Sequence, residues 1–318
     1  MSDTHIKLSF SERSPGYQLI ASLFVVMVLG TVIMVLTVIP GLFIFDFDST
    51  IFVSGNYEAL KKDDINFLRY LLISQDICIF IIPGIYLFRK MNKVISIRNV
   101  FNTRPLLREA GLVILLLFCL SPLIGLTSQL NSAMHFPDWL SGMENWMTEK
   151  ENDADNVFNF LAASKTFSAM IFNLLLIAVL PAIGEEIIFR GVFQNIFQRL
   201  LRNDHLGILV TATLFSAIHL QFFGFIPRLI LGLALGYLYY YSGNLWMPVI
   251  AHFVNNALAV PYFLGGEKFG AQPETFQWSQ IILLPISIYF GAKIFLYFRN
   301  KSKEASLLKT DFLKPGID

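Results

Sequence analysis

The sequence predicts an all-α, polytopic membrane protein with about eight transmembrane helices and both termini in the cytoplasm. Its 318 residues are 55% hydrophobic and only 15% charged, whereas soluble domains carry about 25% charged residues. The mean hydropathy is +0.59. Too few charges are present to cover a water-facing surface, so the apolar runs and the positions of the charges indicate the fold.

Eight apolar runs match or nearly match the roughly 20 residues that cross the hydrocarbon core of a bilayer. They are residues 18–45, 68–88, 110–130, 167–189, 206–223, 227–241, 245–264 and 281–298. The fifth and sixth runs are short, and only the turn-forming triplet Ser242, Gly243 and Asn244 separates the sixth from the seventh. The first run is much longer than the roughly 7–15 apolar residues of a signal peptide. We therefore interpret it as the first span.

The segments between these runs alternate in charge. Basic residues follow the second run (Arg89, Lys90, Lys93, Arg98, Arg104, Arg108) and the fourth (Arg190, Arg199, Arg202), and they fill the tail (Arg299, Lys301, Lys303, Lys309, Lys314). Acidic residues follow the first run (Asp46, Asp48, Glu58, Asp63, Asp64) and the third (Asp138, Glu144, Glu149, Glu151, Asp153, Asp155). Because basic loops favour the cytoplasmic side, this alternation predicts eight spans with both ends inside.

The chain divides into an N-terminal part with three spans and an acidic outer loop (residues 1–165), a part with the remaining spans (166–298) and a basic cytoplasmic tail (299–318). The first two form one integral membrane domain. Residues 136–156 are predicted to be an outer loop with short amphipathic structure around Trp139 and Trp146. The two cysteines, Cys78 and Cys119, lie in apolar runs and are interpreted as packing residues. The net charge of +1 gives no sign of a nucleic-acid partner.

Two adjacent carboxylates end the fourth apolar run. Ionisable side chains in a span are costly, by at least about 2.5 kcal/mol, and are treated first as functional candidates. Glu186 and Arg190 have the i,i+4 spacing of a helical ion pair. Glu185 projects about 100° away from Glu186 on a helix and is free of that partner. The alternative is a salt-bridged helix end at the interface, with Arg190 extending to water.

The fifth and seventh runs also carry polar residues at helical spacing. Phe215 and His219 share one face of the fifth run, and His252 and Asn256 lie one turn apart in the seventh. We expect these residues to form one site with Glu185. The alternative is a set of separate polar contacts between helices.

Other embedded residues are interpreted as structural. Asp76, in the second run, is expected to make a hydrogen-bonded contact between helices, and Gly232 and Gly236 predict close helix packing. The remaining histidines (His5, His135 and His205) lie outside the runs or at their edges and are expected to be solvated.

Three motifs in this order resemble those of the CPBP family, which comprises type II CAAX prenyl endopeptidases, bacteriocin-processing enzymes and Abi proteins. The motifs are Glu185-Glu186-xxx-Arg190, Phe215-xxx-His219 and His252-xxx-Asn256. The resemblance covers residues 173–261 and the glycine-containing sixth run, and none of the motif positions departs from the pattern. It implies an intramembrane endopeptidase of the glutamate type that needs no cofactor.

The resemblance also implies roles for these residues. Glu185 and His219 would activate the attacking water, and His252 and Asn256 would stabilise the oxyanion. Glu186, Arg190 and Phe215 would support the site. A zinc-dependent protease remains an alternative, because Glu185, His219 and His252 are also a plausible set of three zinc ligands. Against zinc, neither histidine lies in an H-E-x-x-H motif.

Two further function classes stay open at this point. Embedded Glu and His residues also mark ion paths, which would suit a transporter or proton relay. Transporters commonly show repeat symmetry and broken helices in both halves, whereas this chain confines its polar residues to one half, which argues against a transporter. A non-catalytic immunity or partner-binding scaffold would keep the same fold. The expected partners are the lipid bilayer and a membrane-associated peptide or protein substrate, and the expected location is a bacterial plasma membrane. The motifs do not identify the substrate.

Overall fold

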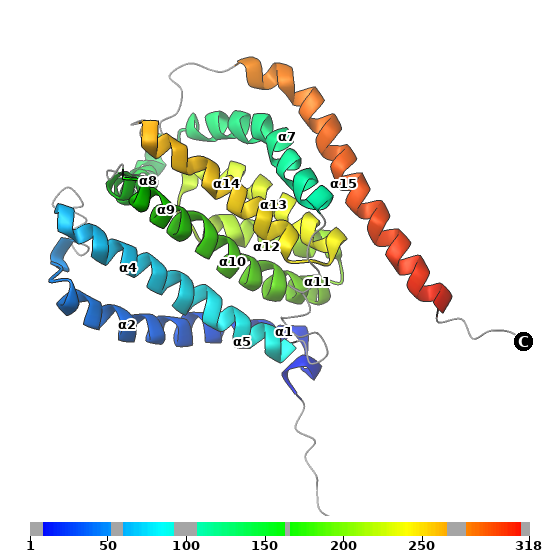
Figure 1. Ribbon diagram of the computed structural model, residues 1–318, viewed down its shortest axis with the longest axis horizontal. Coiled ribbons are helices and arrows are strands. Elements are labelled where there is room, and N and C mark those ends of the chain that lie inside the picture. Colours follow the sequence, from blue (N-terminus) through cyan, green and yellow to red (C-terminus); the bar gives the residue numbers. More distant parts are fainter. Residues whose placement is uncertain (1–8, 52–59, 92–106, 163–165, 266–277, 313–318) are drawn as a thin grey trace, which may run out of the picture.

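The computed structural model describes residues 9–51, 60–91, 107–162, 166–265 and 278–312, and every regular element in these ranges is a helix (Figure 1). The predicted all-α class is therefore confirmed. His5, Glu58, Lys93, Arg98, Arg104 and Lys314, which belong to the expectations above, lie outside the described residues.

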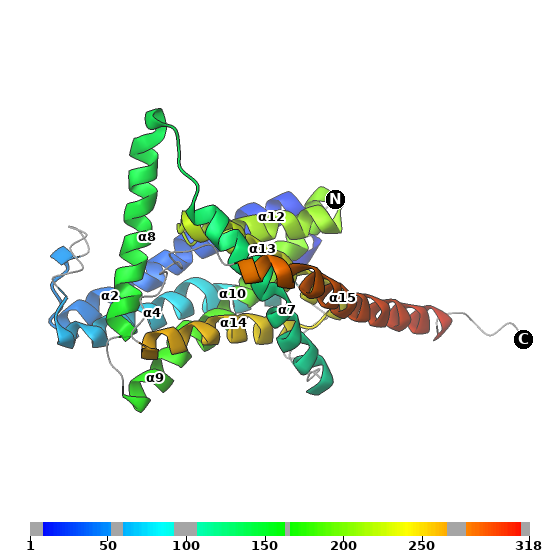
Figure 2. The ribbon, with the colours of Figure 1, turned by 90° about the horizontal axis from the view of Figure 1, so that it is seen from above.

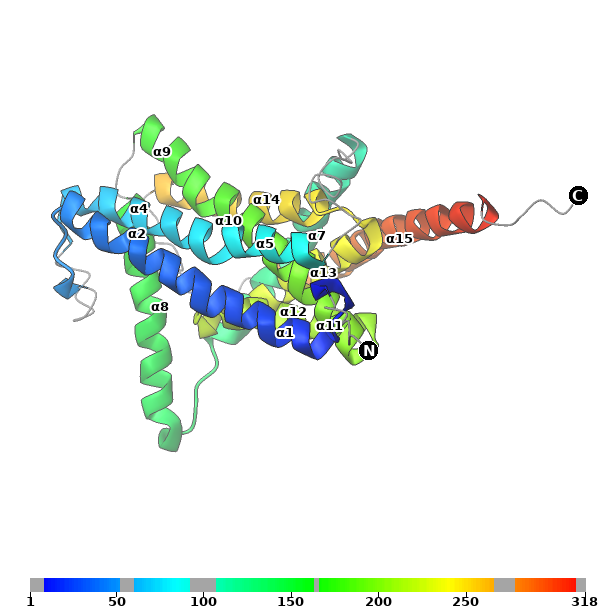
Figure 3. The same cartoon turned by 90° about the horizontal axis from the view of Figure 1, so that it is seen from below.

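Two long helical segments form an N-terminal hairpin on one side of the bundle (Figures 1 and 3). The first comprises α1 (Pro15–Phe24) and α2 (Thr31–Ile44), and the second comprises α4 (Ile65–Gln75) and α5 (Ile82–Met91). A π-helical stretch joins the two parts of each segment, Val25–Gly30 in the first and Asp76–Ile81 in the second. Aliphatic side chains such as Leu36, which is 68% exposed, cover the outer face of the first segment.

The fourth predicted span is one continuous helical segment that extends well beyond its apolar run. It contains α9 (Phe167–Leu174), α10 (Leu180–Glu186) and α11 (Asn195–Leu201), joined by the π-helical stretches Leu175–Val179 and Ile187–Gln194. Arg190 was expected in a basic segment after this span or at its interface end. That expectation is wrong, because Arg190 lies within the helix and is fully buried.

The next three helices pack behind this segment. They are α12 (Asp204–Ala217), α13 (Phe225–Ser242) and α14 (Trp246–Gly265). Helix α12 packs closely on α13 because α13 presents glycines there: a Cβ on Gly232 would lie 3.1 Å from the Cβ of Ala212. The close packing predicted for Gly232 and Gly236 is thus confirmed.

Helices α7 (Leu107–Ser132) and α15 (Trp278–Phe312) pack against each other on the far side of the bundle (Figure 1). Lys301 of α15 pairs with Glu109 of α7, and the guanidinium of Arg108 lies over the ring of Tyr297. Leu116 and Leu117 of α7 share one apolar cluster with residues of α13, α14 and α15.

The acidic segment that was predicted to be an outer loop is more regular than its composition suggested. A 22-residue helix, α8 (Ser141–Ala162), crosses the direction of the bundle and projects from it (Figure 2). The expectation of short structure near Trp139 and Trp146 is therefore wrong. One end of α8 contacts α4, α9 and α14, and Trp146 packs on the ring of Phe222 at 5.2 Å between centroids.

Six helical segments among the described residues are long and apolar enough to cross a membrane, which agrees with an integral, multi-pass membrane protein. They are Pro15–Ile44, Ile65–Met91, Leu107–Ser132, Phe167–Leu201, Phe222–Ser242 and Trp278–Ser302. Helix α12 is apolar but has only 14 residues, and α14 is also helical. The count of eight spans and the sides of the two termini stay predictions.

Candidate active site

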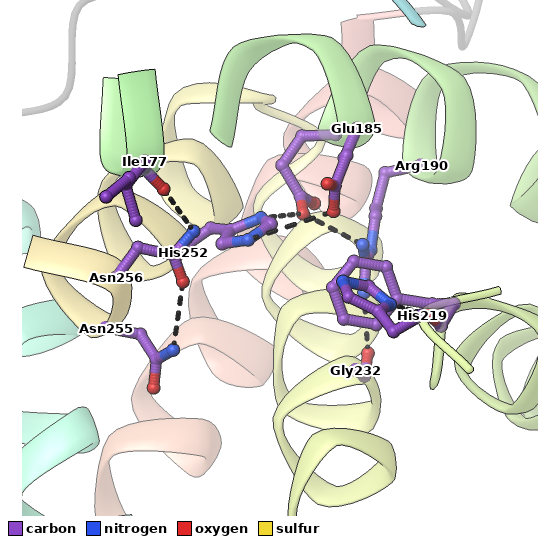
Figure 4. A network of polar contacts seen from close by, with 10 residues as sticks. Ile177, Glu185, Arg190, His219, Gly232, His252, Asn255 and Asn256 are labelled. Carbon is purple, nitrogen blue, oxygen red and sulfur yellow. Dashed lines mark hydrogen bonds and ion pairs between the residues drawn. The ribbon is translucent and has the colours of Figure 1, made fainter. Parts of the chain in front are cut away.

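Residues from all three motifs meet in one cavity of about 400 Å³. Glu185 from α10, His219 from the turn after α12, and His252 and Asn256 from α14 all line it, together with Phe215 (Figure 4). The three motifs are far apart in the sequence, but packing of α14 against α10 and of α12 behind the Ile187–Gln194 stretch brings them together.

A buried network forms one side of the site. Oε1 of Glu186 accepts a hydrogen bond from the guanidinium of Arg190 at 2.8 Å and lies 2.8 Å from Nδ1 of His252. Glu186 and Arg190 are fully buried, and His252 is only 3% exposed. Without Glu186, Arg190 would be a buried charge with no opposite charge to compensate it, which is strongly destabilising.

Arg190 is held by two further contacts. Its NH2 group donates to the backbone carbonyl of Gly232 at 2.9 Å, and its guanidinium lies 4.7 Å from the centre of the Phe215 ring. Gln194, one turn later, donates in the same way to the carbonyl of Gly236. The glycine face of α13 therefore also leaves room for two side chains from the neighbouring segment to reach its backbone.

Hydrogen bonding assigns the tautomers of the two histidines. A backbone carbonyl can only accept, so Nδ1 of His219 donates to the carbonyl of Phe215 at 2.8 Å. This contact satisfies a carbonyl at the C-terminal end of α12, where the helix no longer supplies a backbone donor. In His252 the carboxylate of Glu186 likewise fixes the proton on Nδ1. Nε2 remains available in both rings.

Glu185 stands apart from the ion pair of its neighbour. Its Oε2 atom lies 3.9 Å from Nε2 of His252, and Arg190 bonds to Glu186 instead. No hydrogen-bond partner is present for this oxygen among the described residues. The side chain lines the cavity while being only 8% exposed. The expected division into one paired and one available carboxylate thus agrees with the geometry.

Asn256 lies in the cavity wall with its amide partly engaged. Its Nδ2 atom donates to the carbonyl of Ile177 at 3.2 Å, and its Oδ1 atom accepts from the amide of Asn255 at 3.2 Å. Ile177 belongs to the π-helical stretch Leu175–Val179. One N–H of the Asn256 amide remains for another acceptor, since a primary amide has two.

The structure also places residues in the cavity that sequence reasoning did not assign to it. Asp76 is buried in the cavity wall and has no hydrogen-bond partner among the described residues, so the expected contact between helices is absent. Arg228 and Gln221 line the same cavity. Arg228 falls inside the sixth apolar run. Ionisable side chains in a span are functional candidates, and this rule, which selected Glu185, would also have selected Arg228.

The zinc alternative is not supported by the arrangement of donors. Among the residues that the structure describes, no three His, Cys, Asp or Glu side chains are grouped closely enough to hold a metal ion. This includes Glu185, His219 and His252. The set therefore does not fit a preformed zinc site.

The other predicted histidines are exposed where they are described. His135 contacts Glu144 of α8 at 3.1 Å, and His205 contacts the hydroxyl of Tyr237 at 2.9 Å. The hydrogen bond to His135 and that from the backbone of Phe136 lower the pKa of Glu144. Neither histidine lines the cavity.

Residues 167–258 match the family model described as type II CAAX prenyl endopeptidase Rce1-like. We call these matched residues the Rce1-like segment. The match spans α9 to α14 and includes all three motifs, so it confirms the family resemblance. The cavity is therefore built largely by the Rce1-like segment, while Asp76 is contributed from outside it.

Two curated relatives are named as uncharacterized proteins. The chain is 28% identical over 117 residues to the uncharacterized protein YpbD of Bacillus subtilis (strain 168), covering 36% of this chain and 55% of that protein. It is 34% identical over 96 residues to an uncharacterized 24.3 kDa protein of Escherichia coli, covering 29% of this chain and 44% of that protein. The chain thus matches about half the length of each relative. No solved structure gives a significant match.

Proposed function

We propose that the protein is an intramembrane endopeptidase that hydrolyses a peptide bond of a membrane-associated peptide or protein. The observation that carries this proposal is the placement of the Glu185 carboxylate and the imidazoles of His219 and His252 around a single cavity among apolar helices. The Rce1-like match over residues 167–258 supports the same activity.

The proposed chemistry starts with water between Glu185 and His219. Glu185 has a carboxylate oxygen without a partner, and His219 offers the lone pair of Nε2 because Nδ1 is bound to a carbonyl. Together they would remove a proton from the water, which attacks the carbonyl carbon of the scissile bond. The proton would then pass to the leaving nitrogen, so that a carboxylic acid and an amine are formed.

The opposite wall would stabilise the negative charge that develops on the carbonyl oxygen. His252 can donate from Nε2 when it is doubly protonated, and Glu186 would stabilise that imidazolium through Nδ1. Asn256 could add its remaining N–H. Donors held in a dry cavity need little reorganisation as charge develops, which makes them effective.

The test compares membrane peptides in cells that carry the wild type or Glu185→Gln. Glutamine keeps the size of the side chain and removes the basic oxygen, so we expect uncleaved substrates to accumulate. Glu144→Gln, in the outer segment, is the matched control and should resemble the wild type. If Glu185→Gln and Glu144→Gln give the same peptide pattern at equal membrane abundance, the protein is not this protease. A transporter or a non-catalytic scaffold would give that result.

A further inference from the structure

A second arginine lines the cavity near the start of α13. The guanidinium of Arg228 donates to the backbone carbonyl of Gln221 at 3.3 Å and to the Oε1 atom of its side chain at 2.8 Å. Both acceptors are neutral. Arg228 therefore keeps a full positive charge in the cavity that also holds Glu185 and His219.

No carboxylate of a described residue lies within the 4.0 Å ion-pair distance of Arg228. Glu151 of α8 and Glu185 interact with it only at longer range. Arg190 is different, because it pairs with Glu186 at 2.8 Å. A cation without an ion-pair partner among membrane helices is expensive and indicates a functional position.

The chain around Arg228 is shaped to hold the guanidinium in place. Gln221 uses both its backbone and its side chain as acceptors, and the turn before it contains Leu220 with a positive φ of 54°. A Cβ on Gly224 would lie 3.2 Å from the NH2 group of Arg228, so glycine leaves the space that this group needs. Two of the five guanidinium N–H groups bind Gln221, which leaves three for a ligand.

We propose that Arg228 binds a carboxylate of the substrate peptide and so selects which peptides enter the site. This inference rests on the proposed endopeptidase function. A guanidinium fork matches a carboxylate in shape and charge. Glu185 and Asp76 line the same cavity and would repel an incoming anion, so a cation is needed to admit one. Arg228 carries one positive charge, so it compensates the single charge of a carboxylate fully but the double charge of a phosphate dianion only in part.

The carboxylate can come from two sources, the C-terminus of the peptide or an Asp or Glu side chain. The experiment uses three pools of short N-palmitoylated peptides with degenerate sequences. The first pool has free C-terminal carboxylates and no internal acids, the second has C-terminal amides and no internal acids, and the third has C-terminal amides and one internal Glu. Retention of each pool on nanodiscs that hold the full chain is measured by mass spectrometry in the Glu185→Gln background, which prevents hydrolysis.

We expect a carboxylate pool, the first or the third, to be retained at least about tenfold better than the neutral second pool, the size of one charge-assisted hydrogen bond. Adding Arg228→Gln should bring that ratio to about one, whereas Arg228→Lys should keep part of it. Arg69→Gln is the matched control, because Arg69 contacts Asn173 next to a separate pocket. Which pool is preferred identifies the source of the carboxylate.

The Glu185→Gln protein alone can overturn the proposal. It does so if all three pools are retained equally, or if no pool is retained above the level of empty nanodiscs. The proposal would also be overturned if Arg228→Gln left the preference for a carboxylate pool unchanged. The same holds if Arg69→Gln removed this preference as completely as Arg228→Gln does. A separate measurement tests the proposed protease activity. That proposal is contradicted if peptide cleavage is the same in Glu185→Gln and in the wild type. A protein that binds carboxylate peptides but never cleaves them would retain the carboxylate site and lose the protease assignment.

Discussion

Nδ1 of His252 lies 2.8 Å from Oε1 of Glu186, the oxygen that also binds Arg190. One buried oxygen atom of Glu186 therefore contacts both a histidine of α14 and an arginine that lies four residues after Glu186 in the same helical segment. This arrangement makes Glu186 a positioning residue for two charged or chargeable groups. It also fixes which nitrogen of His252 faces Glu185.

Glu186→Gln should lower the free energy of unfolding by about 3–5 kcal/mol, the usual loss when one partner of a buried ion pair is removed. The amide cannot neutralise Arg190, which is fully buried. The measurement is thermal or detergent-induced unfolding in defined micelles. Glu144→Gln is the control and should change stability by less than about 0.5 kcal/mol, as surface substitutions do. Equal stability of the two variants would contradict the structural role of Glu186.

His252→Ala should reduce the turnover rate by about 10²–10³-fold, the range for one oxyanion donor. The purified protein is assayed on a peptide found in the comparison of cells. His205→Ala provides the control, because His205 is exposed, contacts Tyr237 and Tyr240 and does not line the cavity. A rate for His252→Ala close to that of His205→Ala would remove His252 from the chemistry.

Proteolysis should be resistant to strong chelators, and the purified protein should contain no stoichiometric zinc. The grouped donors that a zinc site needs are absent among the described residues. The measurements are activity after dialysis against chelator and elemental analysis of the active protein. Inactivation by chelator with recovery on added zinc would replace the glutamate mechanism with a metal mechanism and keep the protease.

Gly236→Ala should destabilise the protein by about 1–3 kcal/mol, as overpacking of a tight contact does. The new Cβ would lie 2.8 Å from Cγ2 of Ile208 and 3.0 Å from Oε1 of Gln194. Gly111→Ala, in α7, is the matched control because no neighbouring atom of the described residues lies within 4 Å of its Cβ position. Unfolding of both variants is compared in the same detergent. Equal stability would show that α12 and α13 do not pack as closely as described.

Labelling of single cysteines with a membrane-impermeant reagent tests the topology. Charge alternation predicts that Lys93→Cys is reached from the cytoplasm and Asp153→Cys from outside. Asp153 lies on α8, whereas Lys93 lies outside the described residues. Labelling of both positions from the same side would refute the predicted eight spans and the cytoplasmic termini.

The sequence determined the helical class and the positions of the long apolar segments, because hydropathy is a local property of each run. It also predicted the Glu186–Arg190 ion pair, since residues four apart in a helix lie on one face. The order of the three motifs was enough to indicate the family. Each of these conclusions rests on local patterns, because every apolar run and every single motif consists of residues close to each other in the chain.

Only the tertiary structure decided which groups meet. The bond between Glu186 and His252 joins residues 66 positions apart and depends on how α14 packs against α10. The buried Arg190 likewise depends on α13 presenting the carbonyl of Gly232, and Asp76 and Arg228 reach the cavity from different helical segments. The length of α8 was missed because its residues are polar, and a helix outside the membrane needs no apolar run. Local patterns specify elements and pairs within them, whereas the chemistry of a cavity depends on packing between elements.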